Sequence, residues 1–261
     1  MRLYVENVGD GDPVLFLHGV SSSVRTYGWL ERDGAIRLDF RGHGESERVP
    51  GTYRIADFVE DAVSVLESLD RPAALVGHSL GGVVAWSVAQ QRGDLVTRIF
   101  LEDPPLYMGE PAEHAANPSI PIFVETKAAV ERWQREGVDA EAVKARLAAM
   151  PYLSGTAGDV LLDDALAARA YALLRVDPEV IDRIIDGSLL LGTDTASPVT
   201  VPVFVLASDP AFSALTSEHE VRLAASHPDV EIVRVAGASH SIHDESAYRD
   251  EYARRLDAFL S

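Results

Sequence analysis

Short apolar runs that alternate with helical patterns are the feature that most constrains how this chain can fold. Most of the runs are continuously apolar and are bounded by Gly, Asp or Pro, which is typical of strands buried on both faces of a parallel sheet. Helices between such strands form βαβ units, so we predict an α/β fold with a mostly parallel, doubly wound sheet. The first strand is expected to be antiparallel and at an edge. The predicted strands are residues 2–7, 13–17, 35–38, 73–77, 98–101, 202–207 and 230–235.

Helices are predicted from the spacing of apolar residues and from their start and stop signals. An apolar stripe at helical spacing runs through residues 55–69 and ends before Pro72. Ser217 and Glu220 fit a capping box that opens a helix over 217–226. Further helices are expected over 80–92 and towards the C-terminus, from Tyr248 to Leu260.

One long segment interrupts the alternation. We find no good strand between about residue 105 and residue 199, and the prolines there separate helical patterns. We predict a helical cap, or lid, that is inserted over the carboxyl edge of the sheet after the sixth strand. The core domain would then comprise 1–104 and 200–261, and the cap 105–199. The alternative is an ordinary second helical domain. The helical patterns lie at about 123–136, 139–150, 159–175 and 177–187.

Composition excludes several classes of protein. The chain has 261 residues, no cysteine and a formal net charge of −18. Without cysteine there is no thiolate nucleophile, iron–sulfur cluster, cysteine zinc site or disulfide. The negative charge argues against nucleic acid and anionic membranes as partners, because both bind through Lys and Arg. The chain starts without an apolar leader and no run reaches the roughly 18 residues of a membrane span, so a cytoplasmic protein is expected.

The sharpest local motif is Gly-His-Ser-Leu-Gly-Gly at residues 77–82. It lies between a predicted buried strand and a predicted helix, which is the context of a G-x-S-x-G nucleophile elbow. Gly77 and Gly81 leave room for the sharp turn, and the N-terminus of the helix directs N–H groups at the site. Ser79 is therefore the predicted nucleophile. The alternative is an ordinary serine in a tight turn.

A serine nucleophile needs a base, and the base needs an acid that orients it. In proteins with this elbow, the order along the chain is serine, acid, histidine. His240 follows the strand 230–235 in a loop at the carboxyl end of the sheet, where open α/β sheets bind ligands, and is the predicted base. His243 is its rival. His78 is interpreted as a packing residue, and His219 and His227 are expected to be solvated beside a surface helix.

Two aspartates are candidates for the acid. Asp209 follows the strand 202–207, and Asp103 follows the strand 98–101. Both are expected at the carboxyl edge of the sheet. Both also lie between Ser79 and His240 in the chain, so chain order does not decide between them.

These motifs resemble those of the α/β-hydrolase family, in particular its esterase, lactonase and cofactor-free haloperoxidase group. The resemblance implies the α/β-hydrolase fold and a triad of serine, histidine and acid. The motifs cover most of the chain except the inserted segment, and they are specific to the superfamily rather than to one activity. They are residues 17–20 (Leu-His-Gly-Val), 39–46 (Asp-Phe-Arg-Gly-His-Gly-Glu-Ser), 77–82 and 237–240 (Gly-Ala-Ser-His).

The resemblance also implies roles for single residues. The acid of the family follows the penultimate strand, which corresponds to Asp209 here and leaves Asp103 as the alternative. The stretch Ser-Asp-Pro at 208–210 departs from many relatives, in which a Gly precedes the acid. The two backbone N–H groups that bind the oxyanion correspond to those of Val20 and Leu80.

The loop at residues 39–46 is common in the family, and we expect it to be structural. Arg41 is expected to pair with Asp39 or to brace the loop that contains His18. A direct catalytic role for His43 is not expected.

The predicted function is serine hydrolysis of an ester-type bond, in a carboxylic ester or lactone of a small molecule. Neither a metal nor an organic cofactor is needed, and the protein is expected to be a monomer or homodimer. Ser79 in place of an aspartate argues against the dehalogenase and epoxide hydrolase branches. The alternatives are a C–C bond hydrolase or perhydrolase of the same fold, and a hydrolase-fold receptor or signalling protein with slow turnover.

Overall fold

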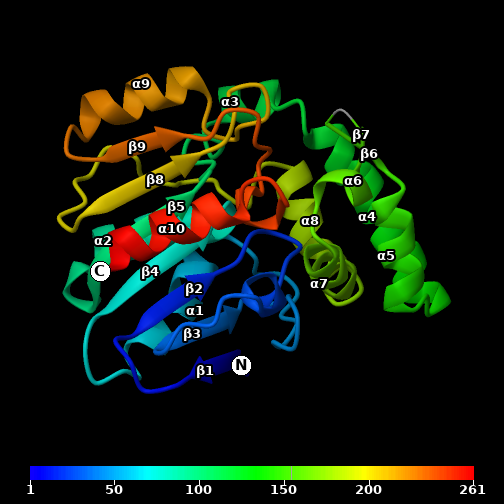
Figure 1. Ribbon diagram of the computed structural model, residues 1–261, viewed down its shortest axis with the longest axis horizontal. Coiled ribbons are helices and arrows are strands. Elements are labelled where there is room, and N and C mark those ends of the chain that lie inside the picture. Colours follow the sequence, from blue (N-terminus) through cyan, green and yellow to red (C-terminus); the bar gives the residue numbers. More distant parts are fainter. Residues whose placement is uncertain (154) are drawn as a thin grey trace.

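The computed structural model describes residues 1–153 and 155–261 and is built on a seven-stranded sheet in the order β1-β3-β2-β4-β5-β8-β9 (Figure 1). β1 is antiparallel to β3, and all other neighbouring strands of this sheet are parallel. The predicted strands and the antiparallel edge are confirmed. The strands are β1 (Tyr4–Val8), β2 (Val14–Leu17), β3 (Ala35–Asp39), β4 (Ala73–His78), β5 (Val96–Glu102), β8 (Val203–Ala207) and β9 (Glu231–Arg234).

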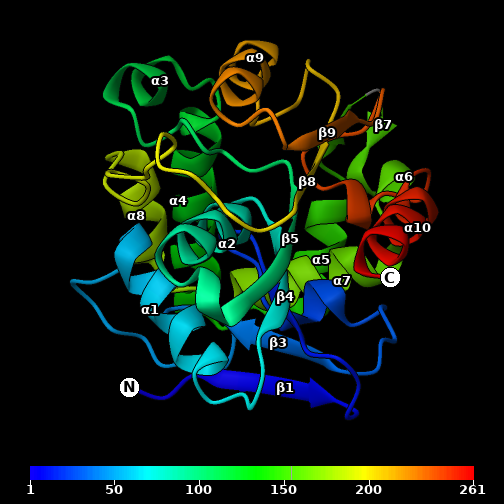
Figure 2. The ribbon, with the colours of Figure 1, turned by 90° about the vertical axis from the view of Figure 1, so that its left-hand side faces the viewer.

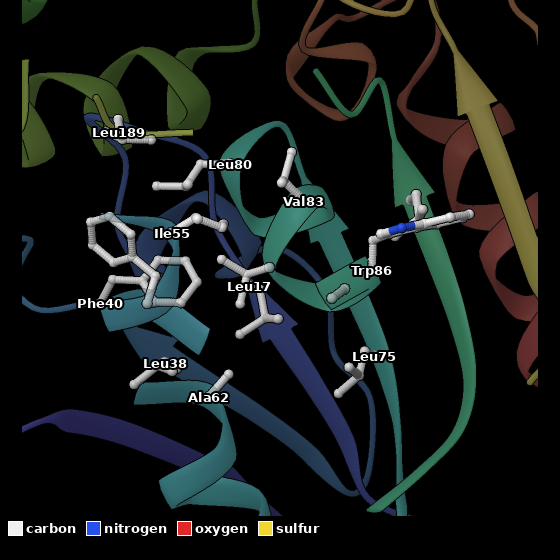
Figure 3. Close-up of a cluster of buried hydrophobic side chains, with 14 of the residues drawn as sticks. Leu17, Leu38, Phe40, Ile55, Ala62, Leu75, Leu80, Val83, Trp86 and Leu189 are labelled. Atoms are coloured by element: carbon white, nitrogen blue, oxygen red, sulfur yellow. The ribbon is translucent and has the colours of Figure 1, made fainter. Parts of the chain in front are cut away.

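Helices cover both faces of this sheet, because successive side chains of a buried strand point to opposite faces. Leu15 and Leu17 of β2 contribute to the larger buried cluster, together with α1 (Ile55–Leu66) and α2 (Leu80–Gln91). Figure 3 shows part of this cluster, with Trp86 of α2 near Leu75 of β4. Val14 and Phe16 of β2 face the other cluster, which includes residues of the short 3₁₀ helix η1 (Val24–Tyr27) and of α10 (Arg249–Leu260).

The helix α9 (Ser217–Ser226) has the predicted bounds, but its predicted capping box is wrong by one residue. Thr216 is the N-cap, and its hydroxyl accepts a hydrogen bond from the backbone N–H of His219 at 3.2 Å. Ser217 is already inside the helix and cannot cap it. His219 and His227 are buried rather than solvated: the ring of His219 lies 3.0 Å from a carboxylate oxygen of Glu113, and His227 contacts the carbonyl oxygen of Thr195.

The inserted segment lies between β5 and β8, to one side of the sheet (Figure 1). The prediction that it follows the sixth strand is wrong. The segment follows the fifth strand, β5. The strands before it are the single antiparallel edge strand β1 and the four parallel strands β2 to β5. The segment also contains a two-stranded antiparallel sheet that the sequence did not predict, β6 (Pro151–Tyr152) paired with β7 (Gly155–Thr156). Its helices are α3 (Pro111–Ala116), α4 (Ile120–Glu136), α5 (Ala140–Ala148), α6 (Ala157–Val160), α7 (Asp163–Leu173) and α8 (Pro178–Ile185).

Two further 3₁₀ helices complete the described part of the chain, η2 (Gly93–Leu95) and η3 (Ile242–Asp244). Within residues 1–153 and 155–261 we find no helix with the length and hydropathy of a membrane span. The division into a core of 1–104 and 200–261 and a cap of 105–199 remains our proposal.

Candidate active site

The turn between β4 and α2 holds Ser79 in an unusual backbone conformation. Its φ is 52° and its ψ is −117°, a region that residues with a Cβ seldom occupy. A Cβ on Gly77 would lie 2.3 Å from the carbonyl oxygen of Gly81, and a Cβ on Gly81 would lie 2.0 Å from the carbonyl oxygen of Leu17. The crowding expected around a nucleophile elbow is therefore present.

Three side chains from separate parts of the chain form a continuous hydrogen-bonded line. The Ser79 hydroxyl lies 2.9 Å from Nε2 of His240, in the loop between β9 and η3. Nδ1 of His240 lies 2.6 Å from Oδ2 of Asp103, directly after β5. An Nδ1–H that donates to Asp103 leaves Nε2 free to accept from Ser79, the tautomer that a general base needs. The structure thus brings Ser79 to His240, the predicted base, rather than to the rival His243.

The expectation that Asp209 orients His240 is wrong, because the structure places Asp103 there. β5 is the direct neighbour of β4, and Glu102 pairs with His78, so Asp103 emerges beside the elbow. Asp209 follows β8, which lies one strand further away. Its carboxylate accepts hydrogen bonds from the backbone N–H groups of Ala211 at 3.0 Å and Gly237 at 2.8 Å, and so stabilises the turn instead.

The carboxylate of Asp103 is fully buried and richly hydrogen-bonded. Besides its contact with His240, the carboxylate accepts a hydrogen bond from the hydroxyl of Ser213. It also accepts hydrogen bonds from the backbone N–H of Ser208 at 3.3 Å and from that of Ala214 at 2.9 Å. Burial alone would raise the pKa of Asp103, but these donors outweigh it and hold the pKa below its ordinary value. Asp103 is therefore ionised at neutral pH, as required of a group that stabilises a protonated histidine.

The predicted oxyanion donors border the elbow. Leu80 is the first residue of α2, so its N–H lies at the positive end of that helix. Gly19, which precedes Val20, lies against the elbow: a Cβ on Gly19 would be 3.3 Å from Cβ of Ser79. The structure gives neither the N–H of Val20 nor that of Leu80 an acceptor among the residues it describes. Both remain our proposal for the oxyanion hole.

The histidines of the motifs support the loops around the elbow. His78, interpreted from sequence as a packing residue, also contacts the carbonyl oxygen of His240 through Nε2 at 3.0 Å. His18 accepts from the N–H of Phe40 at 3.2 Å, and His43 accepts from that of Ser21 at 3.3 Å. Burial lowers the pKa of His18 to about 4 and that of His43 to about 3, so both rings are neutral supports.

Arg41 has a different partner from the two that were expected. Its guanidinium binds Asp61 of α1 at 2.7 Å and Asp57 at 3.0 Å, which ties the 39–46 loop to that helix. Asp39 instead accepts from the backbone N–H groups of Val24 at 2.7 Å and Glu45 at 2.9 Å. The loop is structural, as predicted, but Arg41 neither pairs with Asp39 nor braces the loop of His18.

A second pair of acid and histidine, which we did not predict, lies beside the first. Glu102 precedes Asp103, and its carboxylate accepts from the backbone N–H of His243 at 3.0 Å and contacts Nδ1 at 2.6 Å. Both side chains are fully buried. Burial lowers the pKa of His243, but the charges of Glu102 and Asp244 outweigh it and raise the pKa above its ordinary value. Two features of the sequence could have indicated this second pair. They are the adjacency of Glu102 and Asp103 and the three-residue spacing of His240 and His243.

Among the side chains described, we find no group of three or more His, Asp or Glu placed to hold a metal ion.

Residues 14–255 match the alpha/beta hydrolase family, and the chain belongs to this family of hydrolase-fold enzymes. It is 26% identical over 260 residues to the 2-(acetamidomethylene)succinate hydrolase of Mesorhizobium japonicum, covering 94% of this chain and 87% of that protein. The structure resembles that of the N-formylmaleamic acid deformylase from Pseudomonas putida S16, with a TM-score of 0.76 and 20% identity, over 97% of this chain and 95% of that one. It also resembles that of E-2-(acetamidomethylene)succinate hydrolase, with a TM-score of 0.73 and 23% identity, over 99% and 94% of the two chains. At these identities, the structural matches show the fold.

Proposed function

We propose that this protein is a serine hydrolase that transfers an acyl group from a small molecule to Ser79 and then to water. The observation that supports this most is the line from Ser79 through His240 to Asp103, with distances of 2.9 and 2.6 Å. The order along the chain is serine, acid, histidine, as expected for this elbow. The strained turn holds the hydroxyl of Ser79 next to the N–H groups proposed as the oxyanion hole.

Each group has one task in the proposed reaction. His240 takes the proton of Ser79 as the oxygen attacks the substrate carbonyl, and the N–H groups of Val20 and Leu80 bind the resulting oxyanion. His240 then gives that proton to the leaving group, and an acyl-enzyme remains. Water enters and attacks the acyl carbonyl while His240 accepts its proton. His240 then gives this proton to the oxygen of Ser79 as the ester bond to Ser79 breaks and the acid product departs. Asp103 holds the imidazole in position and stabilises its positive form.

The bond that is cleaved need not be an ester. The sequence led us to expect a carboxylic ester or lactone, with C–C bond hydrolysis among the alternatives. The similar proteins are named for hydrolysis of an acetamidomethylene succinate and for deformylation of a maleamic acid, and neither name denotes an ester. These names support the alternative of a C–C bond hydrolase of the same fold at least as well as ester cleavage, and they add an N-acyl bond as a further candidate. The atom that leaves the acyl carbon would then be an oxygen, a nitrogen or the carbon of a stabilised carbanion. Each of these leaving groups would take the proton from His240.

Matched substrates distinguish these possibilities. Three series that share an acyl group but differ in the atom it leaves would be compared: esters and lactones, N-acyl compounds, and β-diketones. The series with the largest kcat/KM identifies the bond. Activity towards all of them should fall roughly 10⁴-fold or more in Ser79→Ala, because the covalent step is lost. Full activity in Ser79→Ala would refute the proposal.

A receptor with slow turnover would behave differently. We expect rapid labelling of Ser79 by a fluorophosphonate probe and many turnovers of the preferred substrate for each active site. A single slow turnover accompanied by a large thermal shift would instead favour the receptor.

A further inference from the structure

The loop that contains His240 is bonded to the inserted segment on both sides of the histidine. The hydroxyl of Ser239 lies 2.5 Å from that of Tyr152 in β6. On the other side, the guanidinium of Arg169 in α7 donates to the hydroxyl of Ser241 at 3.3 Å. Tyr152 and Arg169 thus reach the two residues that flank the proposed base in the chain.

More hydrogen bonds continue this contact towards α10. The same guanidinium donates to the carboxylate of Asp244 at 3.1 Å, and the side chain of Asp244 is only 6% exposed. The N–H of Leu162 donates to the carbonyl oxygen of Asp244 at 2.9 Å, and the N–H of Ser246 donates to that of Val160 at 3.0 Å. Figure 2 shows α6 and α10 on the same side of the molecule. The inserted segment therefore packs along one side of the loop that contains His240.

The core holds His240 and the main chain of its loop, through Ser79 at the ring, Asp209 before the histidine and Glu102 after it. Asp103 binds the ring, and His78 binds the carbonyl oxygen. Inside the loop, the N–H of Ser239 donates to the carboxylate of Glu245 at 2.6 Å. None of these contacts fixes the side chains of Ser239 and Ser241, and it is these that bind Tyr152 and Arg169.

We propose that Tyr152 and Arg169 are positioning residues for His240, so that the inserted segment takes part in building the catalytic site as well as covering it. This inference rests on the proposed function, in which His240 is the base. A small displacement of the ring would spoil proton transfer from Ser79, and misplacement by about 1 Å can cost roughly 100-fold in rate. The two residues act through the main chain of the loop and need not touch the substrate.

The chain offers matched controls at and just beyond the C-terminal end of α7. The hydroxyl of Tyr171 donates to the carboxylate of Glu45, and the guanidinium of Arg175 binds the same carboxylate at 3.0 Å. These contacts also join the inserted segment to the core, and they also involve one tyrosine and one arginine. Because they end on the 39–46 loop, they leave the His240 loop untouched.

The test compares Tyr152→Phe and Arg169→Met with Tyr171→Phe and Arg175→Met. Each variant would be measured for kcat and KM with the preferred small substrate, for its rate of fluorophosphonate labelling, and for its thermal midpoint. We expect kcat and the labelling rate to fall roughly 10- to 100-fold in the first pair, with KM changed by less than about threefold. In the second pair, kcat and the labelling rate should stay within about threefold of wild type. The thermal midpoint of the second pair should nevertheless fall by about as much as that of the first pair.

A double-variant cycle keeps the proposal falsifiable where Arg169→Met does not fold. If Tyr152 acts through Ser239, then adding Tyr152→Phe to Ser239→Ala should cost little more than Ser239→Ala alone. Fully additive losses, or equal losses in the two tyrosine variants, would overturn the inference. An inactive wild type, or an active Ser79→Ala, would instead overturn the proposed function, so the two failures can be told apart.

Discussion

At the scale of single residues, the two ends of the proposed triad share an uncommon backbone state. Ser79 and Asp103 both have a positive φ, 52° and 42°, which costs a residue with a Cβ roughly 1–3 kcal/mol. Each is held by its neighbours: the N–H of Ser79 donates to the carbonyl oxygen of Glu102, and the N–H of Asp103 donates to that of Leu206, both at 2.9 Å. The pairing of adjacent strands thus maintains the strain that turns both side chains towards His240.

The two aspartates provide a direct comparison of the candidate acids. In Asp103→Asn, the amide cannot stabilise a protonated imidazole and favours the wrong tautomer, so we expect kcat to fall roughly 10³- to 10⁴-fold. Asp209→Asn keeps one oxygen, which can accept only one of the two turn hydrogen bonds that the carboxylate accepts on its separate oxygens. It should lower stability somewhat but retain activity within about threefold, because Asp103, and not Asp209, lies against His240. Steady-state kinetics on the two purified variants is the measurement. A larger loss in Asp209→Asn would show that the geometry of Asp103 is not the catalytic one.

At the scale of elements, β2, β4 and α2 meet so closely at the elbow that only main-chain atoms fit between them. Gly81 has no room for a Cβ, because the atom it would meet is a backbone oxygen of β2, which cannot rotate away. Gly77 has the same difficulty with Gly81 itself. The position of Ser79 therefore depends on how near α2 lies to the strands.

Gly81→Ala tests this packing. The added methyl group must push α2 away from β2, and overpacking of this kind costs about 1–3 kcal/mol. We expect a lower free energy of unfolding in urea and a loss of catalysis together, since the same movement displaces the elbow. Gly93→Ala is the control, because its Cβ would be 3.4 Å from the nearest atom, the hydroxyl of Thr200. Equal stability of the two variants would contradict the packing argument.

At the scale of the whole molecule, buried neutral histidines make the fold sensitive to acid. Burial lowers the pKa of His18 to about 4 and that of His43 to about 3, and it holds the pKa of His78 well below its ordinary value. In the unfolded chain, each ring would titrate near pH 6.5. Below that pH the unfolded chain therefore binds more protons than the folded protein does.

Stability should consequently decrease as the pH falls from about 6.5 towards 4, by up to about 1.4 kcal/mol per pH unit for each of these rings. His243 does not oppose this trend. Its pKa is raised in the folded protein, so the stability that it contributes is lost only as the pH rises above about 6.5 and is constant below that pH. Calorimetry at pH 7.5 and pH 5, in buffers of different ionisation enthalpy, would measure the proton uptake on unfolding. Unfolding at pH 5 without proton uptake would contradict the prediction.

The sequence predicted the parts of the molecule that depend on local patterns. Buried strands are marked by apolar runs, and Ser79 and His240 by the motifs at their ends. The acid was a different problem, because the choice between Asp103 and Asp209 depends on which strand lies beside β4, and chain order carries no such information. The partner of Arg41 was missed for a similar reason, since Asp61 is distant in sequence and close only when α1 packs against the loop.

The adjacent acids at the end of β5 have a consequence for how this sequence can drift over generations. Glu102 and His243 satisfy one another in a site with no exposure, so the loss of either alone leaves a buried group without its partner. Replacement of Glu102 alone or of His243 alone is therefore strongly disfavoured, whereas replacement of both together avoids an unpaired buried group. Because Glu102 directly precedes Asp103 and His243 lies three residues after His240, this buried pair also holds the main chain beside the proposed acid and base.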